Sequence, residues 1–183
     1  MIKSNNIISR DMLDLLSECK GRKVETLLRT SHDFETSFEV VILRFKEYDL
    51  EIWSLEQPDK EGGVPDLAKI IVKKNPAKDS PCPLGKYGEN GEVLPGDFTK
   101  KPIGKVISGI TVYNELVRWT NEYGSFLLAN TYAIVISLGK RYLHIVKDIY
   151  WTEEWDVSFS RSPVPPKPDY DEDEKVSYSS FEL

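Results

Sequence analysis

The chain has 183 residues, a formal net charge of −6 at pH 7 and a sequence pI near 5.1. This length suits one well-cored domain, and the acidic balance argues against nucleic acid or an anionic membrane surface as a partner, because such binding depends on clustered Lys and Arg. Polar residues interrupt positions 1–16, and no apolar run reaches bilayer length. We therefore expect neither a secretion signal nor a membrane span, and hence a cytoplasmic protein.

The two cysteines and two histidines limit the chemistry of the chain. Cys19 lies in an expected helix and Cys82 between prolines, so free thiols are favoured over a disulfide. The histidines, His32 and His144, show no zinc-ligand spacing with the cysteines. The sequence also has no phosphate-binding glycine loop and no nucleophile motif. We predict no metal, no cofactor and no catalytic centre.

A short helix is the first expected element. Ser9 supplies a capping hydroxyl, Asp11 places an acid in the first turn, and the apolar residues that follow recur at helical spacing. Gly21, just after Lys20, is typical of a helix end. A first strand is then predicted over residues 24–28.

Residues 37–55 predict a β-hairpin around which the chain is organised. Two apolar runs, 38–45 and 50–55, flank a polar link at 46–49. The first run is apolar at both odd and even positions, which predicts a strand buried on both faces. One more apolar segment follows at 67–72.

A second copy of the hairpin pattern is the most informative feature of the sequence. The Leu-x-Ile triplet at Leu50 recurs at Leu143. A glycine precedes each triplet: Gly21 lies 29 positions before Leu50, and Gly104 lies 39 positions before Leu143. We therefore predict duplicated units, with ten extra residues in the second that fit between positions 119 and 125. The alternative is a chance likeness of two amphipathic hairpins. The alignment pairs Leu50 with Leu143, Ile52 with Ile145, Val41 with Ile134, and Leu43 with Ile136.

The two copies are expected to cover about residues 20–72 and 103–160, joined by a Pro- and Gly-rich loop at 73–102. In the second copy, Tyr132 and Ile134 are assigned to one apolar face of a strand. Further strands are predicted at 106–113, 142–146 and 157–159.

After Arg161 the composition changes. Residues 161–183 combine a polyproline-like spacer with a run of acids, and three basic residues face six acidic ones. The last residues, 176–183, can either add to an open strand edge or stay in solvent. We thus predict an α+β, mainly β fold. It is a single domain over 1–160 with antiparallel sheet from two similar hairpin-containing halves and a short N-terminal helix, followed by the tail.

Candidate binding residues form three groups. Tyr142 and His144 share one side of a strand, where they would contact a ligand if that side were concave and would otherwise form a half-exposed polar face. Tyr150, Trp151 and Trp155 form an aromatic cluster typical of protein interfaces and sugar-binding platforms, with core packing as the alternative. The third group is the acidic run Asp171, Glu172, Asp173 and Glu174.

These features predict a non-catalytic binding protein. The favoured hypothesis is an acidic domain that neutralises a basic protein partner, as immunity or inhibitor proteins do, and it depends on charge and size alone. The alternative is a small-ligand or carbohydrate-binding β domain that uses its aromatic residues. An enzyme with scattered acids such as Asp33 and Asp156 is disfavoured, because thirty acidic residues form many chance pairs. The oligomeric state is left open.

Overall fold

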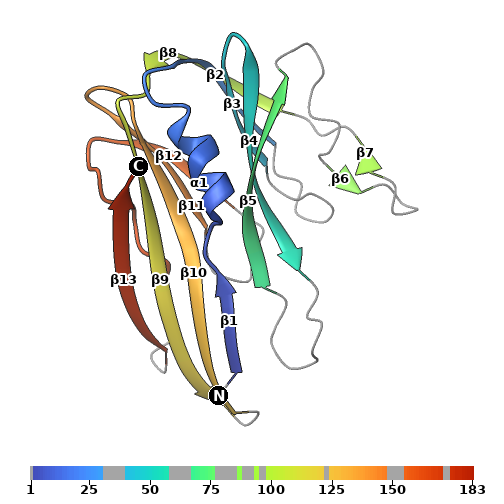
Figure 1. The fold of residues 1–183 in the computed structure, drawn as a ribbon, viewed down its shortest axis with the longest axis vertical. Coiled ribbons are helices and arrows are strands. Elements are labelled where there is room, and N and C mark those ends of the chain that lie inside the picture. Colours follow the sequence, from blue (N-terminus) through green and yellow to red (C-terminus); the bar gives the residue numbers. More distant parts are fainter. Residues whose placement is uncertain are drawn as a thin grey trace.

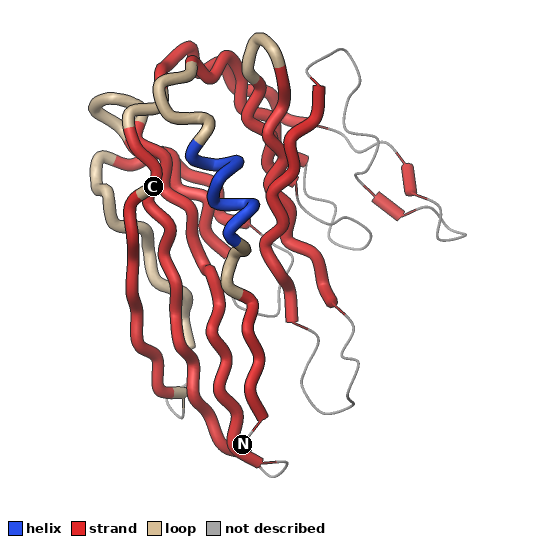
Figure 2. Tube along the Cα trace, viewed as in Figure 1, coloured by secondary structure: helices blue, strands red, loops and turns tan. Residues whose placement is uncertain are grey.

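The structure is a computed structural model that describes residues 2–30, 40–57, 67–76, 86–87, 93–94, 98–121, 124–147, 155–170 and 174–183. The described chain is mainly β with one short helix, as predicted (Figure 2). The elements are β1 (Ile2–Asn6), α1 (Arg10–Ser17), β2 (Lys23–Thr30), β3 (Val40–Arg44), β4 (Tyr48–Gln57), β5 (Leu67–Pro76), β6 (Lys86–Tyr87), β7 (Val93–Leu94), β8 (Phe98–Val106), β9 (Gly109–Asn121), β10 (Gly124–Ser137), β11 (Tyr142–Lys147), β12 (Trp155–Ser160) and β13 (Lys175–Glu182).

Two large sheets account for most of the strands. One has the order β5-β4-β3-β2-β8, and the other has the order β12-β11-β10-β9-β13 with β1 added in parallel to β10. The remaining pairings within both sheets are antiparallel. One hydrophobic cluster draws side chains from β2 to β5 and from β9 to β12, so the sheets share a core (Figure 1).

The two sheets repeat one topology. In the first half, β2 to β5 form a meander and β8 returns to pair with β2. In the second half, β9 to β12 form the same meander and β13 returns to pair with β9. The prediction of two similar halves is therefore confirmed.

The hairpins β3–β4 and β10–β11 match residue by residue. Both turns close with the same backbone bond: Phe45 N–H donates to Tyr48 O, and Leu138 N–H donates to Arg141 O. A shift of 93 positions, which takes Leu50 to Leu143, relates the two hairpins. The matched core pairs are Val41–Ile52 with Ile134–Ile145, and Leu43–Leu50 with Ile136–Leu143.

The first strands of the halves, β2 and β9, match with a shift of 83 positions. Leu27 lies opposite Leu43, and Ile110 lies opposite Ile136, which is the counterpart of Leu43. The shift grows by ten residues between the first and second strands, so the extra residues predicted for the second copy belong to its β9–β10 hairpin.

An approximate two-fold axis relates the halves. Gly21 and Gly104, which are 83 positions apart, both have positive φ angles of 78° and 60°. Lys23 pairs with Val106 in antiparallel register, and the same shift takes Lys23 onto Val106. Because an antiparallel pair is symmetric about its own centre, we infer that the axis passes through this pair. The bond from Gly21 N–H to Ile107 O continues the pairing next to it.

The helix α1 breaks this symmetry. Ser9 caps it by accepting a hydrogen bond from Met12 N–H, as predicted, and Leu16 is fully buried in the shared core. Figure 1 shows α1 between β5 and the second half, and its contacts are with β5. The shift of 83 positions takes its last residues to 98–100, which are strand in β8.

The tail is part of the second half. Of the two possibilities left open for residues 176–183, the structure has strand addition, because β13 pairs with β9. Before β13, the chain crosses the outer face of the sheet, where Tyr113 Oη donates to Pro163 O at 3.0 Å and Pro165 is buried. The polyproline-like spacer therefore covers this face and positions the fifth strand.

Two expected boundaries change. The joint predicted at 73–102 is shorter, because β5 continues to Pro76 and β8 begins at Phe98. The strand predicted at 106–113 is interrupted at Ile107 and Ser108, and β9 begins at Gly109. These two residues form the connection between the halves.

The face assigned to Tyr132 was wrong. The β9–β10 register shifts between Thr131 and Ala133, and a bulge of this kind interrupts the alternation of side chains. Tyr132 therefore packs with Ala133 and Val146 on the outer face, whereas Ile134 lies in the shared core.

Candidate functional site

The predicted aromatic and histidine residues that the structure describes make structural contacts. His144 is 2 % exposed, and its Nε2 lies 2.8 Å from Ser162 O, so the tail covers it. Tyr142 is half-buried at the start of β11. Trp155 is buried in the shared core, and its carbonyl accepts a hydrogen bond from Arg29 Nη2 at 2.8 Å.

The remaining predicted residues do not form a described site with these three. Glu174, immediately before β13, is half-buried. Tyr150, Trp151, Asp171, Glu172 and Asp173 lie outside the described residues. Trp155 faces the core while His144 faces the tail, so the structure places them on opposite faces of one sheet.

Two corners of the fold, related by the repeat, contain clusters of charged side chains. Each corner consists of three parts: the segment around a positive-φ glycine, the turn of the matched hairpin, and one residue of the fourth strand of the meander. The first corner comprises residues 18–25, 45–48 and Lys74, and the second comprises residues 101–108, 138–141 and Phe159.

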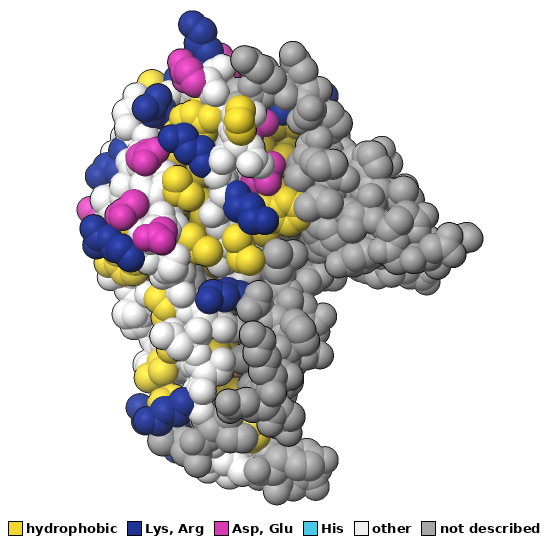
Figure 3. Space-filling view, turned by 45° about the vertical axis from the view of Figure 1, so that its right-hand side comes forward, with side chains coloured by type: hydrophobic (Ala, Val, Ile, Leu, Met, Phe, Trp, Pro, Cys, Tyr) yellow, Lys and Arg dark blue, Asp and Glu magenta, His cyan; other side chains and the backbone are white. Residues whose placement is uncertain are grey.

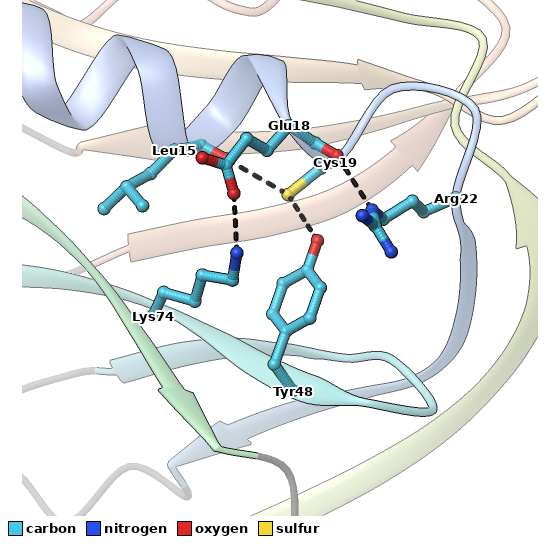
Figure 4. A network of polar contacts seen from close by, with 6 residues as sticks. All are labelled: Leu15, Glu18, Cys19, Arg22, Tyr48 and Lys74. Carbon is cyan, nitrogen blue, oxygen red and sulfur yellow. Dashed lines mark hydrogen bonds and ion pairs between the residues drawn. The ribbon is translucent and has the colours of Figure 1, made fainter.

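The ring of Tyr48 closes the first corner (Figure 4). It stacks on Phe45 with ring centroids 4.7 Å apart, and its hydroxyl lies 3.5 Å from Cys19 Sγ. Lys74 Nζ lies 4.6 Å from the centre of the ring, and the guanidinium carbon of Arg22 lies 5.6 Å from it. These distances are those of cation–π contacts.

An ion pair lies in the first corner. Lys74 Nζ donates to Glu18 Oε2 at 2.6 Å, and this hydrogen bond lowers the pKa of Glu18. Burial raises the pKa of both Tyr48 and Cys19. The phenol and the thiol are therefore neutral at pH 7, and the corner is closed by its own side chains.

The second corner is hollow. A pocket of about 750 Å³ opens there, between β8, the β10–β11 turn and β12. Its described lining combines cationic side chains with an apolar floor, and we call it the basic pocket. The lining consists of Lys101, Pro102, Ile103, Lys105, Val106, Ser108, Leu138, Gly139, Lys140, Arg141 and Phe159.

Substitutions at equivalent positions explain the difference between the corners. Each of the three carboxylates of the first corner is replaced, so the described lining of the basic pocket contains four cations and no carboxylate. Both rings of the first hairpin turn are also replaced. By sequence offset, Lys101 corresponds to Glu18, Ser108 to Glu25 and Lys140 to Glu47, although Glu18 ends α1 whereas Lys101 lies in β8. In the hairpin turns, Leu138 corresponds to Phe45 and Arg141 to Tyr48.

A second hollow of about 530 Å³ adjoins the basic pocket along the gap between the edge strands β8 and β12. It shares Lys101 and Phe159 with the basic pocket and adds Arg29 and Lys100 to the cationic lining. Lys101 Nζ lies 4.0 Å from the centre of the Phe159 ring, so these two side chains meet where the hollows join.

Sequence reasoning missed the basic pocket. The available signal was the run of lysines at Lys100, Lys101 and Lys105, together with Lys140 and Arg141 in a predicted turn. The acidic net charge directed attention to the carboxylates instead, and only the fold brings these cations together.

A buried lysine lies at the other end of β11. Lys147 is fully buried, and its Nζ donates to the carbonyl of Ala68 on β5. Burial lowers the pKa of Lys147 to about 7, while the nearby charge of Glu115 opposes this change. Glu115 is itself buried, and burial raises its pKa although Asn130 Nδ2 donates to it at 2.8 Å. Lys147 joins the two sheets and has no opening to a described pocket.

Among the described residues, no group of three or more His, Cys, Asp and Glu could hold a metal ion. The described part also has no helix of the length and apolarity that crossing a membrane requires. No family model, no curated protein and no solved structure matches the chain. The basic pocket is therefore the feature on which a functional proposal can be built.

Proposed function

We propose that this protein is a non-catalytic binding domain whose basic pocket holds an anionic ligand with an apolar part. The observation that carries the proposal is the described lining, which combines four cations and no carboxylate with an apolar floor. The volume of about 750 Å³ lies within the range of small-molecule sites.

The two parts of the lining have different tasks. Lys105, Lys140 and Arg141 are exposed, so their charges are solvated in the free protein and can turn to a ligand. Lys and Arg side chains can bind an acid group by charge-assisted hydrogen bonds. Val106, which is 50 % exposed, and Leu138 offer apolar surface that a ligand would cover.

Charge elsewhere favours a small ligand over a long polyanion. The net charge of −6 includes the four pocket cations, so the rest of the chain carries −10. On the face shown in Figure 3, basic and acidic side chains lie side by side around hydrophobic patches. Beyond this pocket and the adjoining hollow with Arg29 and Lys100, the chain is acidic on balance, which disfavours a long nucleic acid, whereas a compact anion needs only the pocket.

A fluorescent anion with apolar rings, anilinonaphthalene sulfonate, tests the proposal by titration. Lys140→Glu reverses one charge in the pocket, and we expect it to weaken binding about tenfold. Lys46→Glu makes the same change in the turn of the first hairpin, where the corner is closed, and binding should change less than about twofold.

Thermal unfolding of both variants checks that they are folded. Equal binding by the unchanged protein and both variants would contradict the proposal, and so would an equal loss in both variants. A loss confined to Lys140→Glu supports it.

The expectation of a basic protein partner stays a prediction. Its acidic run lies outside the described residues except for Glu174. Deleting residues 161–183 to test it would also remove β13, so substituting the acids of the tail is the better experiment.

A further inference from the structure

The side chains of the first corner surround an aromatic ring, and we call the space that this ring occupies the seat. The Tyr48 ring lies against Phe45 and within cation–π range of Lys74 and Arg22, and it is 5 % exposed. An aromatic face attracts cations because its π electrons make it negative. The seat therefore combines an apolar wall with positive charge around a planar group.

The second corner keeps the frame of this seat without the ring. Its turn closes with the same backbone bond, and Lys105 stands where the first corner has Arg22. Arg141 replaces Tyr48, so the position that supplies the ring in the first half supplies a further cation in the second. Phe159, on the strand equivalent to β5, adds an aromatic wall.

We propose that the ligand of the basic pocket is an aromatic anion, a planar ring that bears a carboxylate or similar acid group, and that its ring takes the place corresponding to the Tyr48 ring. This inference rests on the proposed function, because it names the class of anion that the same pocket holds. The ligand supplies two features of the first corner that the second lacks, a ring at the position corresponding to Tyr48 and a negative charge.

Each part of such a ligand has a described partner. Phe159 already lies 4.0 Å from the charge of Lys101, and its ring can also stack on a ligand ring. The planar guanidinium of Arg141 can stack on the other face of the ligand. The acid group can be bound by Lys105 and Lys140 at the rim. An aliphatic acid would gain the apolar contact and the ion pair, but not the contacts that depend on π electrons.

Two carboxylates with the same number of carbons, naphthoate and undecanoate, separate these contributions. Both are measured by displacement of anilinonaphthalene sulfonate from the full chain, below the micelle concentration of undecanoate. We expect naphthoate to bind about tenfold more tightly, as cation–π and stacking contacts allow. Equal affinities, or tighter binding of undecanoate, would overturn this inference while leaving the proposed function intact. Failure of all three anions to bind would overturn both.

A pair of variants at one position locates the ring. Arg141→Tyr places a tyrosine where the first corner has Tyr48, and we expect its ring to occupy the seat and reduce naphthoate binding at least about thirtyfold. Arg141→Gln removes the same charge without adding a ring, and a loss of about fivefold is expected. Thermal unfolding shows whether each variant is folded.

The difference between the two variants decides the position of the ring. A much larger loss in Arg141→Tyr than in Arg141→Gln supports the correspondence with Tyr48. Equal losses would place the ligand ring elsewhere in the pocket and overturn the inference.

Discussion

The two corners share a positive-φ glycine and the backbone of a hairpin turn, and they differ in the side chains that fill them. In the first, Tyr48 is buried between Phe45 and two cations, and Glu18 pairs with Lys74. In the second, Arg141 stands at the equivalent position beside a pocket of about 750 Å³. A repeated fold can therefore provide structural closure in one half and a candidate binding site in the other.

The physical difference is what occupies the space beside the cations. In the first corner Lys74 pairs with Glu18 and the Tyr48 ring is buried, so the corner is filled by its own side chains. The second leaves Lys105, Lys140 and Arg141 exposed to water, which costs little in the free protein and leaves them available to an anion. The proposed ligand would complete in the second corner what tyrosine completes in the first.

The largest expected effect comes from truncating the two equivalent residues, Tyr48 and Arg141, and comparing the losses of stability. Tyr48→Ala removes a buried ring, and we expect it to reduce the free energy of unfolding by about 3 kcal/mol. Arg141→Ala removes an exposed side chain, and a change below about 0.5 kcal/mol is expected. Urea unfolding measures both. Similar losses at the two positions would contradict the view that only the first corner is closed by its own side chains.

A second contrast between the halves depends on pH. The shift of 93 positions takes Ser54, which is fully buried, to Lys147. Burial lowers the pKa of Lys147 from 10.5 to about 7, so between these values the unfolded chain binds more protons than the folded protein. Stability therefore rises with pH in this window.

We expect the free energy of unfolding to rise by about 2 kcal/mol more in the unchanged protein than in Lys147→Met between pH 7 and pH 9. Urea unfolding at several pH values gives both curves. Lys147→Met keeps a long unbranched side chain and removes the titrating amine, so titrating groups that do not interact with Lys147 cancel in the difference. Parallel curves would show that Lys147 is not perturbed as burial implies.

The smallest expected effect tests the symmetry itself. Gly21→Ala and Gly104→Ala each place a Cβ in open space at positive φ, so each should cost about 1 kcal/mol through the backbone alone. Gly109→Ala is the control, because its φ is not in that region and the added Cβ would make an ordinary contact with Ser137. It should not destabilise the protein. Unequal costs at Gly21 and Gly104 would weaken their equivalence.

Much of the fold could be predicted because its signals are local or repeated. Ser9 and the residues after it specify a capped helix, and the alternation around Leu50 and Leu143 gave two hairpins in the register that the structure has. The side of Tyr132 could not be predicted, because a bulge at Thr131 changes the alternation without a clear mark in the sequence. The tail was ambiguous because strand addition depends on the edge it meets, here β9.

The sequence by itself determined that the chain is mainly β, that it repeats, and which apolar residues of one hairpin correspond to those of the other, because side-chain periodicity and turn spacing act over a few residues. Only the tertiary structure showed that the second repeat forms a basic pocket where the first is closed. Lys101, Arg141 and Phe159 come from three segments far apart in the chain, and only the folding of β8 beside the second half brings them around one pocket. A net charge summed over the whole chain cannot reveal such a cluster, because electrostatic recognition depends on the charges that lie close together in space.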